Sequence, residues 1–221
     1  MNITKSLIQQ QTKFYFFILL FFYSAISFAQ SDKQSQAILK SISAKYKSFS
    51  SLKVDFTYTI DNPKAKTNET QTGTIQLKGI KYKLEIKGQE VISDGKTVWT
   101  YLKDAKEVQI NEVNTKEDAV TPSTIFTIYE KGFESVFVEE KKEGTKLVQI
   151  IDLKPVDTKK NYFKIRLSID KNEKLVISTK IFDKNGNHYT YAIKQFSPNL
   201  PLQDALFTFN VASHPGVRWW I

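Results

Sequence analysis

The chain has 221 residues, no cysteine, and 32 lysine and arginine residues against 23 acidic ones, which gives a formal charge of +9. The absence of cysteine excludes a disulfide, a thiolate metal site and a cysteine nucleophile within this sequence. Positive charge can favour anionic surfaces. The lysines, however, are spread along alternating positions, which favours a solvated lysine-rich face, so we expect no nucleic-acid partner.

The first 29 residues have the pattern of a secretory signal peptide. Lysines precede an apolar run from Phe14 to Phe22, and Ser27-Phe28-Ala29 offers a cleavage site of mostly small residues. The run is shorter than the roughly 20 apolar residues that a membrane-spanning helix needs. We therefore expect residues 1–29 to be removed on export and residues 30–221 to fold as one domain.

An amphipathic helix is expected from about Gln34 to Phe49. Apolar residues, Ile38 and Ile42 among them, recur there at spacings of three and four, and neither proline nor glycine interrupts them. Such a stripe needs a partner surface, and the sequence that follows predicts a sheet.

The next segments alternate with the period of β-strands. From Leu52 to Ile60 every second residue is apolar, and the alternation returns in short stretches as far as Ile110, with glycines between them. The Asp94-Gly95 pair should supply the positive φ angles of a tight hairpin. We expect these strands to form an antiparallel meander.

A short central helix separates this meander from a second one. Thr121 can cap it, Pro122 fits its first turn, and Gly132 ends it. Further strands are expected over 133–138, 147–153, 162–169, 175–182 and 189–196, with Leu206–Phe209 as an edge strand. A sheet of about ten or eleven strands tends to curl and to leave a concave face, which side chains, helices or a ligand must fill.

No catalytic or metal-binding motif is evident. His188 and His214 have no companion ligand nearby, and the sequence lacks the G-x-S-x-G elbow, a phosphate-binding glycine loop, a calcium loop and the zinc-protease pattern. We therefore expect a protein that is not an enzyme and needs no cofactor or metal. A hydrolase built on a curved sheet is the alternative, but the sequence contains no nucleophile motif that supports it.

Large apolar residues are abundant on the expected strands and helices. A filled core is their ordinary explanation, but a single twisted sheet with two short helices has one covered face, so some of them can line a cavity suited to acyl chains. The candidate lipid-binding residues are Ile38, Ile42, Phe56, Tyr58, Ile75, Leu77, Tyr82, Leu84, Trp99, Tyr101, Ile125, Phe126, Ile128 and Tyr129.

Several of these residues lie in segments that match a known family. The segments are Val54-x-Phe56-x-Tyr58, Gly73-Thr74-Ile75-Gln76-Leu77, the S-D-G-K-T-x-W-x-Y stretch from Ser93 to Tyr101, Ala205-Leu206-Phe207-Thr208-Phe209 and Pro215-Gly216-Val217. Together with the signal peptide and the opening helix, they resemble the LolA-type periplasmic outer-membrane lipoprotein carriers. The Ser93–Tyr101 stretch is the most specific of them, and the resemblance spans essentially all of residues 30–221.

The resemblance implies an unclosed, strongly curved antiparallel β-barrel of about 11 strands, with helices covering the concave face. It implies a periplasmic chaperone, expected as a monomer, that shields the acyl chains of lipoproteins and delivers them from the inner to the outer membrane. Its partners would be acylated lipoproteins, an inner-membrane ABC-type lipoprotein releasing complex and an outer-membrane acceptor. A periplasmic lipid or lipoprotein sensor of the same fold is the alternative, and a structural protein with a filled interior is another.

One position departs from the family pattern. Family members hold the helical lid shut through an arginine that follows the strand beginning at Gly73, and Gly79 and Ile80 occupy that place here. The resemblance therefore implies a lid that is held in another way.

Overall fold

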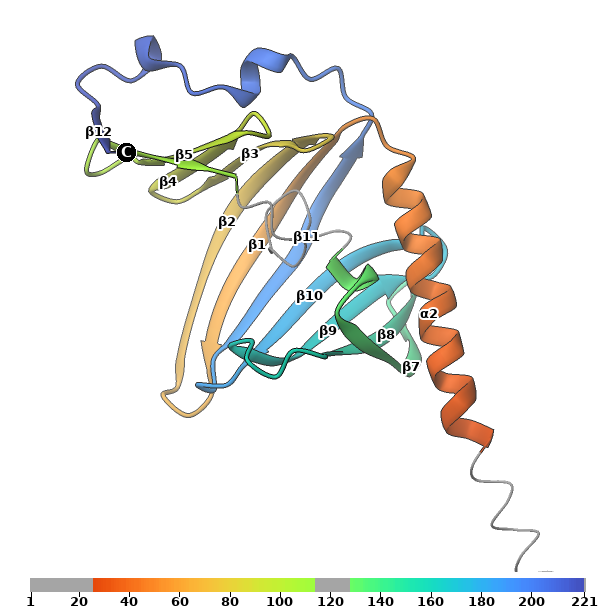
Figure 1. Ribbon diagram of the computed structural model, residues 1–221. Helices are drawn as coiled ribbons and strands as arrows, with labels where there is room; N and C mark the ends of the chain where they lie inside the picture. The colour runs from red at the N-terminus through yellow and green to blue at the C-terminus, as the bar shows by residue number, and fades with distance from the viewer. Residues whose placement is uncertain (1–25, 114–127, 221) are drawn as a thin grey trace, which may run out of the picture.

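The structure, a computed structural model, describes residues 26–113 and 128–220. These residues form one long helix, three short 3-10 helices and a twelve-stranded sheet that does not close (Figure 1). The helix and the strands of the first half are α2 (Ile26–Lys47), β1 (Leu52–Asn62), β2 (Thr67–Lys78), β3 (Lys81–Ile86), β4 (Gln89–Ser93), β5 (Thr97–Leu102) and β6 (Glu107–Glu112). The second half comprises η1 (Ile128–Glu130), β7 (Phe133–Glu143), β8 (Lys146–Pro155), β9 (Tyr162–Asp170), β10 (Leu175–Asp183), β11 (His188–Pro198), η2 (Asp204–Phe207), η3 (Val211–Ser213) and β12 (Arg218–Trp220).

The sheet consists of two meanders joined along one seam. Its strand order is β12-β6-β5-β4-β3-β2-β1-β11-β10-β9-β8-β7. The seam is the antiparallel pair of β1 and β11, and β12 adds to β6 in the parallel sense. The end strands β7 and β12 do not pair with each other, so the sheet remains an open, curled half-barrel, as the alternating sequence and the family resemblance predicted.

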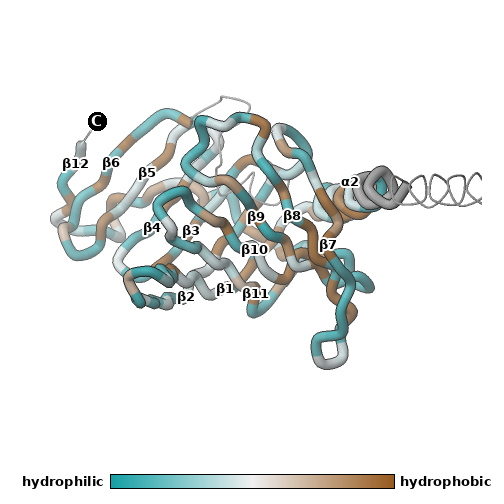
Figure 2. The backbone as a smooth tube through the Cα atoms, turned by 90° about the horizontal axis from the view of Figure 1, so that it is seen from below, coloured by the Kyte–Doolittle hydropathy of each residue, from teal (hydrophilic) through white to brown (hydrophobic). Residues whose placement is uncertain are grey.

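The strand register sorts the alternating side chains onto two faces. Ile75 lies opposite Val54 on one side and opposite Leu84 on the other, so these residues share a face. We call this face, around which the sheet curls in Figure 1, the inner face. Hydrophobic and hydrophilic residues alternate along β9 in Figure 2, as expected for a strand with one buried side, whereas β8 has a run of four buried residues from Val148 to Ile151.

The helix α2 packs on the inner face. Leu39, Ile42 and Tyr46 follow the helical spacing of three and four, and all are buried in the main core cluster together with inner-face residues of the sheet. The Tyr46 hydroxyl accepts a hydrogen bond from the backbone N–H of Val176 in β10, 3.2 Å away. This contact fixes the end of the helix against the sheet.

The helix differs in its limits from the predicted one. The sequence placed it from Gln34 to Phe49, whereas α2 begins at Ile26 and ends at Lys47. After Lys47, the backbone N–H groups of Ser48 and Phe49 donate to the carbonyls three residues earlier, of Lys45 and Tyr46, and not to those four residues earlier as in an α-helix. The helix runs across the expected signal cleavage site, and cleavage there stays a prediction.

The hairpin at Asp94-Gly95 is present but differs in type. Three residues, 94–96, connect β4 and β5, and of these only Gly95 has a positive φ, of 93°. The Asp94 carboxylate accepts hydrogen bonds from the backbone N–H groups of Lys96 and Thr97, both at 2.8 Å. The aspartate therefore shapes the turn through its side chain and not through a left-handed backbone.

The prediction of an edge strand at Leu206–Phe209 is wrong. Asp204–Phe207 form the 3-10 helix η2, and the β6 edge, where a further strand could add, pairs instead with β12. Phe207 and Phe209 are buried. The two phenylalanines alternate in the sequence because both are buried and hold an irregular segment that runs across the sheet (Figure 1).

A second, smaller core cluster lies on the outer face, opposite the inner one. It contains Ile92, Val108 and Phe209, with Trp99 and Tyr101 packed against it. The C-terminal segment supplies Phe209 and covers this side of β3 to β6 (Figure 1). The two faces are therefore covered by different elements, the inner face by α2 and the outer face by the C-terminal segment.

Candidate functional site

Most of the predicted lipid-binding residues meet on the inner face. Five of their side chains are buried in the main core cluster: Ile42, Ile75, Leu77, Tyr82 and Tyr129. Others pack against this cluster and are only partly buried: Ile38, Phe56 and Leu84. The inner face thus brings together residues from α2, from η1 and from β1 to β3.

The seam between β1 and β11 carries a wall of half-buried aromatic side chains. The ring of Tyr58 stacks on Tyr191 at a centroid distance of 4.8 Å and on Tyr189 at 6.4 Å. Phe56 adjoins Tyr191 at 6.2 Å. We call Phe56, Tyr58, Tyr189 and Tyr191 the aromatic wall. Burial, with Tyr58 and Tyr189 close by, raises the pKa of Tyr191 well above its usual value, so its hydroxyl stays neutral.

Gly73 has no side chain, and this leaves room for the ring of Phe56, the first residue of the aromatic wall. It lies opposite Phe56 in the β1–β2 register, and a Cβ atom added to it would stand 2.6 Å from the Phe56 ring. The same added atom would come within 2.9 Å of the Ile86 side chain. The glycine of the Gly73–Leu77 segment therefore serves packing, because a larger residue would push the phenyl ring off the sheet.

Neither Tyr189 nor Tyr191 is among the candidate lipid-binding residues named from the sequence, although Tyr191 belongs to the aromatic residues expected on the strands. Both belong to β11, which is far from β1 in sequence and pairs with it in space. The period of two in 189–196 shows that alternate residues share a face, but nothing local indicates that this face continues the one of Tyr58. Pairing of the first and the last long strand supplies that information.

Trp99 and Tyr101 lie on the outer face. Val91 pairs with Leu84 on the inner face, and its neighbour Ile92 pairs with Trp99, so Trp99 points the opposite way. The Tyr101 ring contacts Phe209 and His214, at centroid distances of 5.8 and 4.6 Å. These two aromatic residues of the family-like hairpin anchor the C-terminal segment.

The remaining predicted residues were placed on an expected central helix. Ile125 and Phe126 lie outside the described residues. The residues described at the expected end of that helix form η1, which contains Ile128 and the buried Tyr129. The assignment of lipid contacts to these residues stays a prediction.

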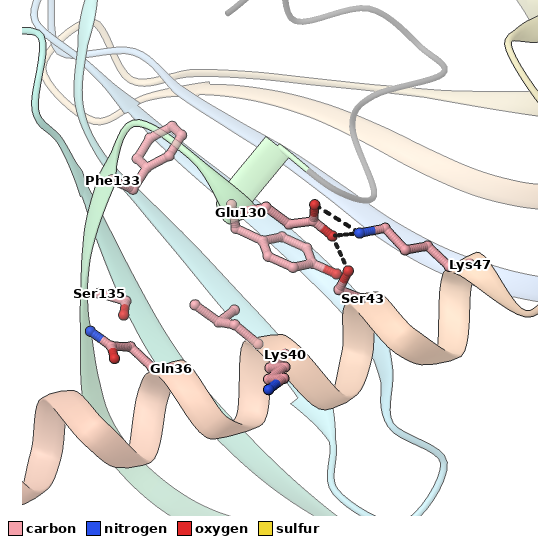
Figure 3. Close-up of a pocket in the computed structure, with 9 residues that line it drawn as sticks. Gln36, Lys40, Ser43, Lys47, Glu130, Phe133 and Ser135 are labelled. Carbon is pink, nitrogen blue, oxygen red and sulfur yellow. Dashed lines mark hydrogen bonds and ion pairs between the residues drawn. The ribbon is translucent and has the colours of Figure 1, made fainter. Parts of the chain in front are cut away.

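A pocket of about 410 Å³ opens where α2, η1 and β7 meet (Figure 3). It is lined by Gln36, Leu39, Lys40, Ser43, Lys47, Tyr129, Glu130, Phe133 and Ser135. Leu39 and Tyr129 belong to the main core cluster, and Phe133 packs against it. The pocket is therefore a polar-rimmed extension of the apolar inner face.

Polar contacts join α2 to the elements around the pocket. The Glu130 carboxylate accepts hydrogen bonds from the Ser43 hydroxyl and from Lys47 Nζ, which lies 2.7 Å from one of its oxygens (Figure 3). Nearer the start of the helix, the buried Ser35 hydroxyl donates to the Ser135 carbonyl at 3.1 Å. These bonds tie η1 and β7 to the helix that covers the inner face.

The position that the family resemblance assigns to arginine lies away from this helix. Ile80 stands in the turn between β2 and β3 and is 69% exposed. Its side chain covers Gly95, where an added Cβ would come within 2.5 Å of it. In this protein that position joins two neighbouring hairpin turns, and α2 makes polar contacts with η1, β7 and β10.

Tyr129 is the most unusual polar group of the site. It is 5% exposed, and its hydroxyl has no hydrogen-bond partner. Burial, together with the nearby Tyr46 and Glu130, raises its pKa well above the usual value. The hydroxyl therefore stays protonated and keeps a hydrogen to donate.

The described ranges contain no group of three or more histidine, aspartate or glutamate side chains placed to hold a metal ion. Among the same residues, no helix has the length and the apolar character needed to cross a membrane. What the site offers chemically is an apolar surface with a few polar groups at one end.

Comparison with known proteins identifies the family. The model described as outer membrane lipoprotein carrier protein LolA matches residues 47–210. The outer-membrane lipoprotein carrier protein of Pasteurella multocida (strain Pm70) is 26% identical over 200 residues, which are 88% of this chain and 89% of that protein. Its namesake in Histophilus somni (strain 2336) is 27% identical over 165 residues, covering 72% and 76% of the two chains.

Solved structures share the fold at low sequence identity. The crystal structure of an uncharacterized conserved protein from Thermus thermophilus aligns with a TM-score of 0.56 and 11% identity, over 85% of this chain and 98% of that one. At this identity the likeness concerns the fold alone. The family match covers most of the chain, and the curved open sheet and its helix agree with it: the chain belongs to the LolA family of outer-membrane lipoprotein carrier proteins.

Proposed function

We propose that the protein is a periplasmic carrier that shields the acyl chains of lipoproteins between the inner and the outer membrane, and that it acts without catalysis. The observation that supports this most directly is the aromatic wall. Phe56, Tyr58, Tyr189 and Tyr191 remain half-buried on the face that elsewhere forms the core. A ligand with apolar chains that lay on these four side chains would bury the aromatic surface that remains accessible in the folded protein.

The energetics of such binding are favourable. Each methylene removed from water contributes about 0.8 kcal/mol. Association itself costs roughly 4–15 kcal/mol. Burial of about twenty methylenes, little more than one long acyl chain, would therefore already offset that cost. Two or three chains on one lipoprotein would give binding strong enough for transport through water.

Release of such a ligand requires that the cover of the inner face opens. α2 is held by an apolar stripe and by polar contacts with η1 and β7. The Lys47–Glu130 pair is partly exposed, with 62% and 31% of the side chains accessible, and surface pairs of this kind contribute at most about 1 kcal/mol. We propose η1 and the adjoining part of α2 as the moving lid.

The partners follow from this role. An inner-membrane ABC-type lipoprotein releasing complex would load the carrier, and an outer-membrane acceptor would receive the cargo. Residues 1–29 would direct export to the periplasm. The names of the related carriers in Pasteurella multocida and Histophilus somni support a lipoprotein as the cargo.

Binding of a synthetic lipopeptide tests the proposal. The exported protein is titrated with a fluorescent diacylated peptide and with the same peptide lacking its acyl chains, and only the first should bind. Tyr58→Lys places a charge in the aromatic wall and should weaken binding at least tenfold. The matched control is Phe163→Lys, because Phe163 is 51% exposed and lies outside the aromatic wall.

Circular dichroism and thermal unfolding of both variants establish that the sheet is intact. Equal affinity of the two peptides would overturn the carrier function. Equal loss of binding in both variants would overturn the location of the site.

A further inference from the structure

The pocket between α2, η1 and β7 has the size of a small-molecule site. Its volume of about 410 Å³ lies within the range of roughly 300–1,000 Å³ usual for ligand pockets. Its apolar residues Leu39, Tyr129 and Phe133 connect it to the main core cluster. A ligand bound in the pocket would therefore contact residues of the main core cluster on the inner face.

The hydrogen-bonding groups of the pocket are not equivalent. Ser43 and Lys47 donate to Glu130, and Ser135 bonds to Ser35. The hydroxyl of Tyr129 is buried with no partner. An unpaired buried hydroxyl is unfavourable, so an acceptor that reaches it would restore a hydrogen bond that folding alone leaves unmade.

The charge around Tyr129 narrows the chemistry of that acceptor. The pocket as a whole is not anionic, because Lys40 and Lys47 line it together with Glu130, and Lys47 pairs with that carboxylate. Glu130 is the charged group that acts on the Tyr129 hydroxyl, however, so a neutral acceptor is favoured there over phosphate or a free carboxylate. A neutral carbonyl oxygen accepts hydrogen bonds and carries no net charge. Among acylated ligands, the ester carbonyl next to each chain meets this description.

We propose that this pocket receives the ester-bearing end of the acylated ligand, with the Tyr129 hydroxyl donating to an ester carbonyl oxygen and the acyl chains extending over the inner face. The inference rests on the proposed carrier function and adds a polar subsite to it. The hydroxyl is itself buried, so a ligand must displace the side chains around it, and the arrangement in this structure is a closed one. Since the closed arrangement leaves Tyr129 unpaired, ligand binding favours the opened one.

A pair of ligands that differ only in the carbonyl tests the subsite. The exported protein is titrated with a peptide bearing two ester-linked palmitoyl chains and with its dialkyl ether analogue of equal chain length. Wild type should bind the ester about fivefold more tightly, as expected for one buried hydrogen bond. Tyr129→Phe should abolish this preference and leave the affinity for the ether unchanged.

The matched control is Tyr101→Phe, because Tyr101 lies on the outer face against the C-terminal segment. It should keep the full preference for the ester. Tyr129→Phe removes a hydroxyl that has no partner, so its thermal stability should equal or exceed that of wild type.

The outcomes separate this inference from the carrier function. If wild type binds both ligands equally, or if Tyr129→Phe retains the preference, the subsite is overturned while the carrier function stands. If wild type binds neither ligand, the carrier function fails.

Discussion

Removing the side chain of Ile42 tests how α2 is held on the inner face. Ile42 is fully buried in the main core cluster, between Leu39 and Tyr46 on the same face of the helix. Ile42→Ala deletes apolar atoms and leaves a cavity, which together cost about 2–5 kcal/mol of unfolding free energy. For a domain of this size each kcal/mol lowers the melting temperature by about 2–4 °C, so the expected drop is about 4–20 °C.

The assay is urea unfolding followed by tryptophan fluorescence, with thermal unfolding as a second measure. Lys40→Ala is the control, since Lys40 lies on the same helix and is exposed. It should change the unfolding free energy by less than about 0.5 kcal/mol. A loss below about 1 kcal/mol for Ile42→Ala would show instead that α2 contributes little to the core.

Three further perturbations address the lid, the outer face and the aromatic wall. Glu130→Gln should loosen η1 from α2 and speed amide hydrogen exchange in both elements; unchanged exchange would count against the lid assignment. On the outer face, burial would raise the pKa of Asp152, but the hydrogen bonds and charge of Arg166, together with Lys164, outweigh burial and lower it. The stabilising contribution of Asp152 is therefore present above about pH 4 and is lost as the pH falls through the lowered pKa. Asp152→Asn should flatten the dependence of stability on pH in that acid range, and an unaltered pH profile would contradict the pairing. Gly73→Ala should displace the Phe56 ring and lower the free energy of unfolding, measured by chemical unfolding, by about 1–3 kcal/mol. An unchanged free energy of unfolding would show that the Phe56 ring can move aside without cost.

The strands and the main helix could be predicted because their apolar residues repeat with a clear period. From Leu52 to Ile60 the period of two coincides with the inner face of β1, and the spacing of Ile38 and Ile42 coincides with the packed side of α2. Local pattern sets these features, so the sequence carries them directly.

The faces could not be assigned from the same patterns. An alternating strand has two faces, and the choice between them depends on the register across each hairpin. Trp99 and Tyr101 alternate as regularly as Phe56 and Tyr58, yet the β4–β5 register turns them to the outer face. The alternation of Leu206–Phe209 was equally ambiguous, because two buried anchors of an irregular segment have the same spacing as a strand.

The polar part of the site depends on contacts between distant segments. Ser43 and Glu130 are far apart in the sequence and lie in different elements, and neither belongs to a motif. The unpaired hydroxyl of Tyr129 is likewise a property of its surroundings, since a tyrosine in a sequence carries no sign of whether its hydroxyl will find a partner.

Identification of the molecules that the protein carries is the decisive experiment for the carrier function. The exported protein is purified from the periplasm in which it is expressed, and co-purifying lipid-modified proteins are identified by mass spectrometry. We expect acylated lipoproteins to co-purify with wild type and with Phe163→Lys, and to be lost with Tyr58→Lys. Recovery of free fatty acid or phospholipid, with no lipoprotein, would contradict the carrier function and favour a sensor or a general lipid-binding protein.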